Sequence, residues 1–252
     1  MKNPWVIIGI IAVVLIGGSV WYSGTVSESY NEGITIVPKV TGNEGSTIKL
    51  VEYSDFQCPA CGQFWPVVEE VLAEYGDRIS FEYKHFPLIQ IHPFAQPAAY
   101  AAEAAGQQGK FYEYANLLFK NQDTWSKSAT PAAYFAEYAE TLELDMDKFM
   151  RHQRAPLVKD HVRSQFNEAR ALGLTGTPSF YLNGERMNLT TIDEFKAQIE
   201  AAVKPNVGFN LDGATPPLQM IQVEGDVETA VPVPGAEAPA ETNAAPAVQF
   251  GI

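Results

Sequence analysis

The sequence is poor in cysteine: its 252 residues contain only two, Cys58 and Cys61, separated by Pro59 and Ala60. A structural zinc site needs four ligands, and the chain offers neither a second CxxC pair nor an HxxxH pair to complete one. A structural disulfide between the two cysteines is a weaker alternative to a redox role. Closing a loop of two residues removes little entropy from the unfolded chain and so adds little stability, and no other cysteine is available as a partner.

Basic residues are also scarce. Lys and Arg number 17 against 30 Asp and Glu, which leaves a net charge of −13. A phosphate-binding face must be basic, so this balance argues against nucleic acid as a partner. The acidic residues Asp77, Glu82 and Asp123 do not form a recognisable calcium loop, and neither a metal nor another cofactor is expected. The chain length suits one domain with appendages.

Charge is missing altogether from residues 5–22, an apolar run with aromatic residues at both ends. As a helix, this run reaches across the hydrocarbon core of a bilayer, roughly 30 Å thick. Lys2 precedes it and Glu28 and Glu32 follow, which predicts an uncleaved anchor with a cytoplasmic N-terminus. A cleaved signal peptide is the alternative, although its apolar region would be unusually long. In either case the cysteines lie outside the cytoplasm, where disulfides persist.

The cysteine pair lies where a predicted strand is followed by a predicted helix. Residues 48–53 alternate in polarity and are of types that favour β-strands, whereas the apolar residues of 62–75 recur at helical spacing. The free amides and the positive dipole end of a helix stabilise a thiolate at Cys58, while Cys61 lies one turn deeper. Because the thiolate is the reactive form of cysteine, this arrangement indicates a thiol–disulfide exchanger.

The remaining periodicity predicts a βαβ half and a ββα half separated by a helical insert. Strands are expected at residues 34–37, 48–53, 79–86, 179–182 and 185–187, with Asn183 and Gly184 forming the hairpin turn. Helices are expected at residues 62–75, 93–105, 110–120, 131–141, 145–151 and 156–172, and from a capping box at 191–194 to 203. This order places the chain in the α/β class.

Four segments are expected along the chain. Residues 1–24 form the membrane anchor and 25–45 a linker. Residues 46–204 form the α/β domain, with its helical insert at about 92–173. Residues 205–252 form an acidic tail rich in Pro and Ala, with no Lys or Arg, and we expect disorder after about Gly225.

Several features together resemble the DsbA-like branch of the thioredoxin superfamily over about residues 46–203. They are the Cys-Pro-Ala-Cys motif at 58–61, the Gly-Thr-Pro-Ser-Phe segment at 176–180, and the helical insert between them. The segments at 84–88 and 91–93 also look like those of membrane-anchored or secreted relatives in that branch. The resemblance implies a thioredoxin-like fold with a helical insert.

The resemblance also implies roles for the motif residues. Cys58 would be the exposed nucleophile and Cys61 the shielded resolving thiol. Pro178 would be a cis-proline facing the disulfide, and Thr177 would offer its backbone to a substrate strand. A trans, strand-initiating Pro178 is the alternative. The substrate-binding residues are then taken to be Thr177, Pro178, Pro59 and Ala60.

Glu52 lies six positions before Cys58, where thioredoxin-like proteins place a buried acid. In a strand, Leu50, Glu52 and Ser54 share one face, and a central strand is covered on both faces. A desolvated carboxyl group has a raised pKa and can relay a proton to the resolving thiol, a catalytic role that we expect for Glu52. The alternative is an ordinary exposed strand glutamate.

Other candidates carry weaker signals. His85 and His92 lie near the end of a predicted strand, but isolated histidines are usually structural or solvated. Phe64 and Trp65 could line a substrate groove, yet their helical spacing is more typical of core residues.

These features predict an extracytoplasmic thiol:disulfide oxidoreductase that exchanges a Cys58–Cys61 disulfide with exported protein thiols, with oxidation as the favoured direction. The Pro-Ala dipeptide lacks a histidine that would stabilise the thiolate, so an intermediate potential is expected. A membrane or soluble redox partner would recycle the pair. A disulfide reductase or isomerase is one alternative. A membrane-tethered peptide-binding adaptor is another, against which the intact CxxC and Glu52 argue.

Overall fold

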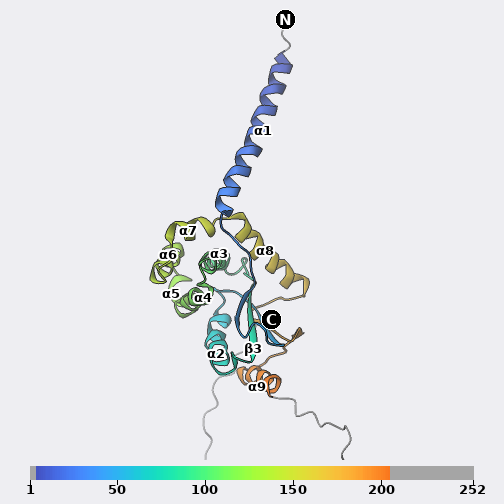
Figure 1. Cartoon of the computed structure of the whole chain (residues 1–252), viewed down its shortest axis with the longest axis vertical. Helices are drawn as coiled ribbons and strands as arrows, with labels where there is room; N and C mark the ends of the chain where they lie inside the picture. The colour runs from blue at the N-terminus through green and yellow to red at the C-terminus, as the bar shows by residue number, and fades with distance from the viewer. Residues whose placement is uncertain (1–3, 205–252) are drawn as a thin grey trace, which may run out of the picture.

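A computed structural model describes residues 4–204, which begin with a long helix, α1 (Pro4–Asn31), standing away from the globular body (Figure 1). Its segment Ile8–Asn31 is long and apolar enough to cross a membrane. The helix therefore continues past the apolar run at residues 5–22 into the stretch expected to be a linker. Gly33 follows it with a φ of +75°, the left-handed conformation that glycine adopts readily after a helix.

The chain after α1 differs from the prediction. Residues 34–37, expected as a strand, are irregular, and the first strand is β1 (Lys39–Gly42). The Lys39 side chain is buried and its Nζ lies 2.8 Å from Oε2 of Glu103, far along the sequence. This long-range ion pair and the pairing of β1 with another strand determine where the first strand forms. Neither interaction can be predicted from the alternation of apolar and polar residues along a short segment.

A mixed five-stranded sheet forms the centre of the domain, in the order β1-β3-β2-β4-β5. The four strands after β1 are β2 (Ile48–Ser54), β3 (Ile79–His85), β4 (Ser179–Leu182) and β5 (Glu185–Arg186). Strands β2 and β3 are parallel, and the other neighbouring pairs are antiparallel. Asn183 and Gly184 have φ values of +53° and +85°, as expected for the predicted two-residue hairpin turn.

Helices account for most of the remaining chain up to residue 204. They are α2 (Pro59–Tyr75), α3 (Ala95–Gly106), α4 (Phe111–Lys120), α5 (Gln122–Trp125), α6 (Pro131–Thr141), α7 (Met146–His152), α8 (Pro156–Ala171) and α9 (Ile192–Val203). Only the short α5 was not predicted. The α/β class, the thioredoxin-like order of elements and the helical insert are confirmed, whereas the predicted tail lies outside the described residues.

The two faces of β2 contact different helices. Leu50 belongs to the main apolar core, which includes residues of α2 and α9. Tyr53 points to the other face and packs in a smaller cluster with Ala169 of α8. Helices α2 and α8 accordingly lie on opposite sides of the sheet (Figure 1). Glu52 shares the Leu50 face, which directs its side chain towards the core beneath α2.

Aromatic side chains join the helical insert to the rest of the domain. The Phe56 ring stacks on Tyr83 of β3, with centroids 5.0 Å apart, and contacts Phe119 of α4. Trp65 of α2 stacks on the same Phe119 at 4.8 Å. Trp65 and Phe64 are almost fully buried, as predicted for core residues. Because Phe56 lies just before Cys58, this packing holds the start of α2 against the insert.

Candidate active site

The two cysteines lie at the junction of β2 and α2. After β2 ends, a turn closed by a hydrogen bond from Cys58 N to Asp55 O, 3.0 Å long, leads into α2. Cys58 is the N-cap residue in extended conformation, and Pro59 takes the first helical position, where its missing N–H costs nothing. Both cysteines are free thiols; Cys58 is 6% exposed and Cys61 is fully buried.

A loop from the far end of the sequence faces Cys58. The peptide bond between Thr177 and Pro178 is cis. The Cys58 Sγ donates a hydrogen bond to the carbonyl oxygen of Thr177 over 3.4 Å. The structure thus brings Cys58, Thr177 and Pro178 together across more than a hundred residues of sequence.

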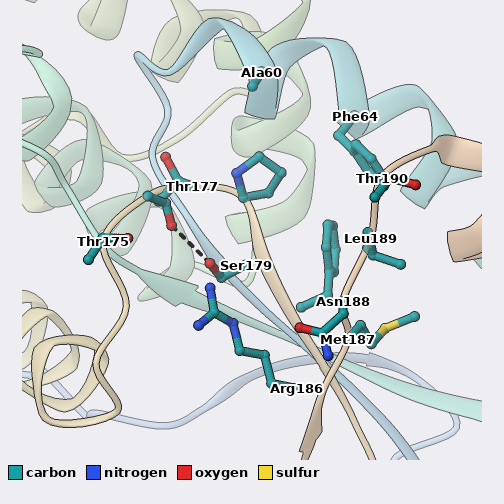
Figure 2. Close-up of a pocket in the computed structure, with 13 residues that line it drawn as sticks. Ala60, Phe64, Thr175, Thr177, Ser179, Arg186, Met187, Asn188, Leu189 and Thr190 are labelled. Atoms are coloured by element: carbon teal, nitrogen blue, oxygen red, sulfur yellow. Dashed lines mark hydrogen bonds between the residues drawn. The ribbon is translucent and has the colours of Figure 1, made fainter. Parts of the chain in front are cut away.

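Beside this contact lies a cavity of about 340 Å³ between the start of α2, the Thr177–Pro178 loop and the chain after β5. In Figure 2, Ala60 and Phe64 on α2 lie across the cavity from Ser179 and Arg186. The remaining lining residues are Thr175, Gly176, Thr177, Pro178, Phe180, Met187, Asn188, Leu189 and Thr190. Three of the expected substrate-binding residues therefore share one cavity, while Pro59 is exposed outside its lining.

Cys58 is an acidic thiol. A hydrogen bond with the Cys61 side chain is the largest influence and lowers the pKa of Cys58 to about 6. Burial acts in the opposite direction, as does the charge of Asp55, whereas Thr177 and the Cys61 backbone add to the lowering. The pKa of Cys58 is lowered, as predicted from the helix N-terminus, but the main cause of the lowering is the neighbouring thiol of Cys61.

Cys61 and Glu52 are both held in their neutral forms. Burial, followed by the hydrogen bond and charge of Cys58, raises the pKa of Cys61 well above its usual value. Glu52 is fully buried, and burial raises the pKa of its carboxyl group to about 8; the nearby Ser54 side chain offsets only part of this. Neither carboxyl oxygen of Glu52 has a hydrogen-bond partner within residues 4–204. Glu52 and Cys61 also act on each other electrostatically.

A family model described as thioredoxin matches residues 35–201, about two thirds of the chain. The chain belongs to this thioredoxin family. Its predicted DsbA-like fold is confirmed by solved structures with TM-scores above 0.5.

Three of these structures illustrate the shared fold of the thioredoxin domain. BdbD from Bacillus subtilis is 19% identical with a TM-score of 0.57, over 69% of this chain and 95% of BdbD. Alpha-DsbA1 from Wolbachia pipientis is 19% identical with a TM-score of 0.56, over 69% of this chain and 95% of that protein. A thioredoxin-like oxidoreductase from Silicibacter pomeroyi is 24% identical with a TM-score of 0.56, over 66% of this chain and 91% of that protein.

Curated relatives that match more than half of this chain are much longer proteins. Na(+)/H(+) antiporter NhaA 3 of Salinispora tropica is 40% identical over 147 residues, which are 58% of this chain and 22% of the antiporter. NhaA 1 of Salinispora arenicola shows the same identity and coverage. The chain thus spans about a fifth of the length of these relatives, and antiporter activity does not carry over from them.

His85 and His92, the two histidines with weak signals in the sequence, have different surroundings in the thioredoxin domain. His85 is buried, and its Nε2 lies 3.0 Å from Oε1 of Glu103 in α3, within a cluster that also contains Lys39. This is the structural role expected for it. His92 instead contacts Asp55 beside the active-site turn. Within residues 4–204, His, Cys, Asp and Glu side chains do not form a group of three that could hold a metal ion.

Sequence reasoning missed Gln122 of α5. Its Nε2 donates hydrogen bonds to the carbonyl oxygens of Phe56, at 2.8 Å, and Cys58, at 2.9 Å. Gln122 also fills the space beside Gly62, where an added Cβ would lie 2.6 Å from its Oε1. A lone glutamine in an unpredicted single-turn helix carries no local pattern that could have revealed this contact.

Proposed function

We propose that this protein is a thiol:disulfide oxidoreductase that oxidises thiols of exported proteins. The observation that carries the proposal is the pairing of an acidic, slightly exposed Cys58 with a fully buried, neutral Cys61 beside the Thr177–Pro178 loop. Membership of the thioredoxin family and the DsbA-type fold support thiol–disulfide exchange in general.

The exchange proceeds through two attacks. A substrate thiolate attacks Sγ of Cys58 in the oxidised protein, forms a mixed disulfide, and breaks the Cys58–Cys61 bond with Cys61 as the leaving thiolate. A second substrate thiolate then attacks the substrate sulfur of the mixed disulfide and releases Cys58 as a thiolate. The substrate loses two electrons and two protons, and the cysteine pair of the protein gains both electrons.

Glu52 supplies a proton in this scheme. With a pKa of about 8, its carboxyl group is protonated at neutral pH. The departing Cys61 sulfur is buried in the same core, where a thiolate is strongly disfavoured. We propose that Glu52 donates its proton to Cys61 as this thiol leaves, and that water restores the proton.

The cavity beside Cys58 suits an extended peptide. It is bordered by the backbone of Thr177 and Pro178 on one side and by Ala60 on the other. We propose that Thr177 pairs with the substrate backbone, that Pro178 and Ala60 contact the residues flanking the substrate cysteine, and that exposed Pro59 contacts the substrate from outside the cavity.

Oxidation is the proposed direction because a stabilised Cys58 thiolate stabilises the reduced protein and makes its disulfide a stronger oxidant. A reductase or isomerase remains the alternative within the same chemistry. A peptide-binding adaptor without turnover is less well supported, because binding alone does not require an acidic Cys58 facing a neutral buried thiol.

The function is tested by incubating the oxidised full-length protein in detergent with a reduced peptide containing two cysteines. We expect the peptide to become oxidised as Cys58 and Cys61 become reduced, and Cys58→Ser to abolish the transfer. Equilibration with glutathione gives the direction: a potential close to thioredoxin, about −270 mV, would make the protein a reductase. Peptide binding without transfer would favour the adaptor.

We further propose that α1 anchors the protein in a membrane with the thioredoxin domain outside the cytoplasm, where a membrane or soluble partner reoxidises the cysteine pair. Lys2 before the apolar run and acidic residues after it support this orientation. In spheroplasts, added protease is expected to degrade the domain. Protection of the domain until the membrane is permeabilised would contradict this topology.

A further inference from the structure

Asp55 is a buried carboxylate directly before the active-site turn. Its side chain is fully buried, and its backbone carbonyl accepts the turn-closing bond from Cys58 N. Oδ1 accepts a hydrogen bond from Gln57 N at 2.7 Å, and Oδ2 accepts one from Leu88 N at 2.9 Å. The same Oδ2 lies 2.7 Å from Nδ1 of His92. One side chain therefore joins the residues before Cys58 to the loop after β3.

The charge of Asp55 opposes the chemistry proposed for Cys58. A carboxylate this close to the turn disfavours a second negative charge, and it acts to raise the pKa of Cys58. His92 offsets this charge: its ring is mostly buried, and the hydrogen bond to Asp55 raises the pKa of His92. Cys58 acts on His92 in the same direction. Because coupling between two charged groups is mutual, protonated His92 favours the Cys58 thiolate.

We propose that His92 is a positioning residue that, when protonated, neutralises Asp55 and so keeps Cys58 in its reactive thiolate form. The inference rests on the proposed function and goes beyond it. The histidine that is missing between the two cysteines is replaced by one that acts through Asp55 from another loop. Loss of the His92 proton leaves the buried Asp55 charge uncompensated, so thiolate reactivity depends on the protonation of His92 as well as of Cys58.

Other titratable groups around Cys58 must be separated from this effect. Cys61 faces it from α2 and Glu52 from β2, while Thr177 contributes polar atoms from the cis loop. Cys61 and Glu52 are neutral near pH 6 because burial raises the pKa of each. Near pH 6 the charges around Cys58 are therefore those of Asp55, His92 and Cys58 itself.

The test is a double-mutant cycle on the reduced full-length protein in detergent, with His92→Gln, Asp55→Asn and the combined variant. Glutamine keeps a donor for Asp55 but carries no charge. We expect His92→Gln to slow alkylation of Cys58 at pH 6 about fivefold, with the pKa of Cys58 raised accordingly. In the Asp55→Asn background, removing His92 should change the rate less than about twofold, because no buried Asp55 charge is left to offset and only the direct interaction of His92 with Cys58 remains.

If His92→Gln slows the alkylation of Cys58 equally with and without Asp55→Asn, the proposal is overturned, since His92 would then act only by holding the loop after β3 in place. An unchanged alkylation rate in His92→Gln would overturn it as well. The matched control is His161→Gln, which removes a partly buried histidine near Glu103 and should leave Cys58 unaffected. These measurements need no substrate, so their outcome does not depend on whether the protein oxidises peptides.

A second measurement covers the case in which the variants do not fold. In the unmodified protein, the pKa of His92 read by NMR should be higher in the reduced than in the oxidised form, because only the reduced form contains the Cys58 thiolate. Identical His92 titrations in the two redox forms would overturn the proposal without any substitution.

Discussion

Replacing Cys61 with alanine is expected to raise the pKa of Cys58 by one unit or more, whereas replacing it with serine should leave the pKa close to 6. The Cys61 side chain is the largest influence holding the pKa of Cys58 down, because it donates a hydrogen bond to the Cys58 sulfur. A serine hydroxyl at the same place can donate as well, but a methyl group cannot. Burial of Cys58 then acts against the thiolate with less opposition.

The measurement is thiolate absorbance against pH on the reduced variants. A rise of one unit makes Cys58 about tenfold poorer in thiolate at pH values well below its pKa, so alkylation at pH 5 should slow in proportion. Both variants lack the second sulfur, so they report on Cys58 alone. Equal pKa values in the alanine and serine variants would show that the helix N-terminus, and not the neighbouring side chain, determines the acidity of Cys58.

Replacing Glu52 with glutamine is expected to stabilise the protein strongly in alkaline solution. The folded protein holds the carboxyl proton up to a pKa of about 8, against a usual value of 4.5, because the group is fully buried. Between these values the folded state binds more protons than the unfolded state, so the free energy of unfolding falls as pH rises. The loss reaches the order of 5 kcal/mol above pH 8, and a neutral glutamine does not incur it.

Urea unfolding of the reduced protein at pH 5 and pH 9 measures this difference. The stability of Glu52→Gln relative to the unmodified protein should increase from pH 5 to pH 9, whereas the exposed control Glu137→Gln should show no such trend. The same Glu52→Gln variant should exchange disulfides more slowly near neutral pH, since glutamine has no proton to give Cys61. Parallel pH dependence of the variant and the unmodified protein would show that Glu52 is ionised when folded.

Local sequence information was sufficient for the active-site scaffold. The alternation of β2 placed Leu50 and Glu52 on one face, and the helical spacing of residues 62–75 predicted most of α2. Asn183 and Gly184 predicted the hairpin turn because few other residue pairs adopt positive φ at both positions. These features depend on residues within a few positions of one another, and backbone sterics and side-chain periodicity act over that range.

Local information was less reliable where distant groups compete for the same segment. Residues 34–37 have strand-forming character, but the strand formed at Lys39–Gly42, where β3 offers backbone partners and Glu103 attracts the buried Lys39. The single turn α5 has no periodicity of its own, yet it delivers Gln122 to the carbonyl of Cys58. Neither outcome is contained in the neighbouring residues.

The sequence by itself determined most of the element order, the placement of Cys58 and Cys61 at a strand–helix junction, and the apolar helix that precedes them. The tertiary structure alone decided the contact of Cys58 with Thr177 and the pairing of Asp55 with His92. It also decided how fully Glu52 is buried. The reason is physical: helix and strand formation follows short-range periodicity, whereas acidity depends on desolvation and on charges that only folding brings together.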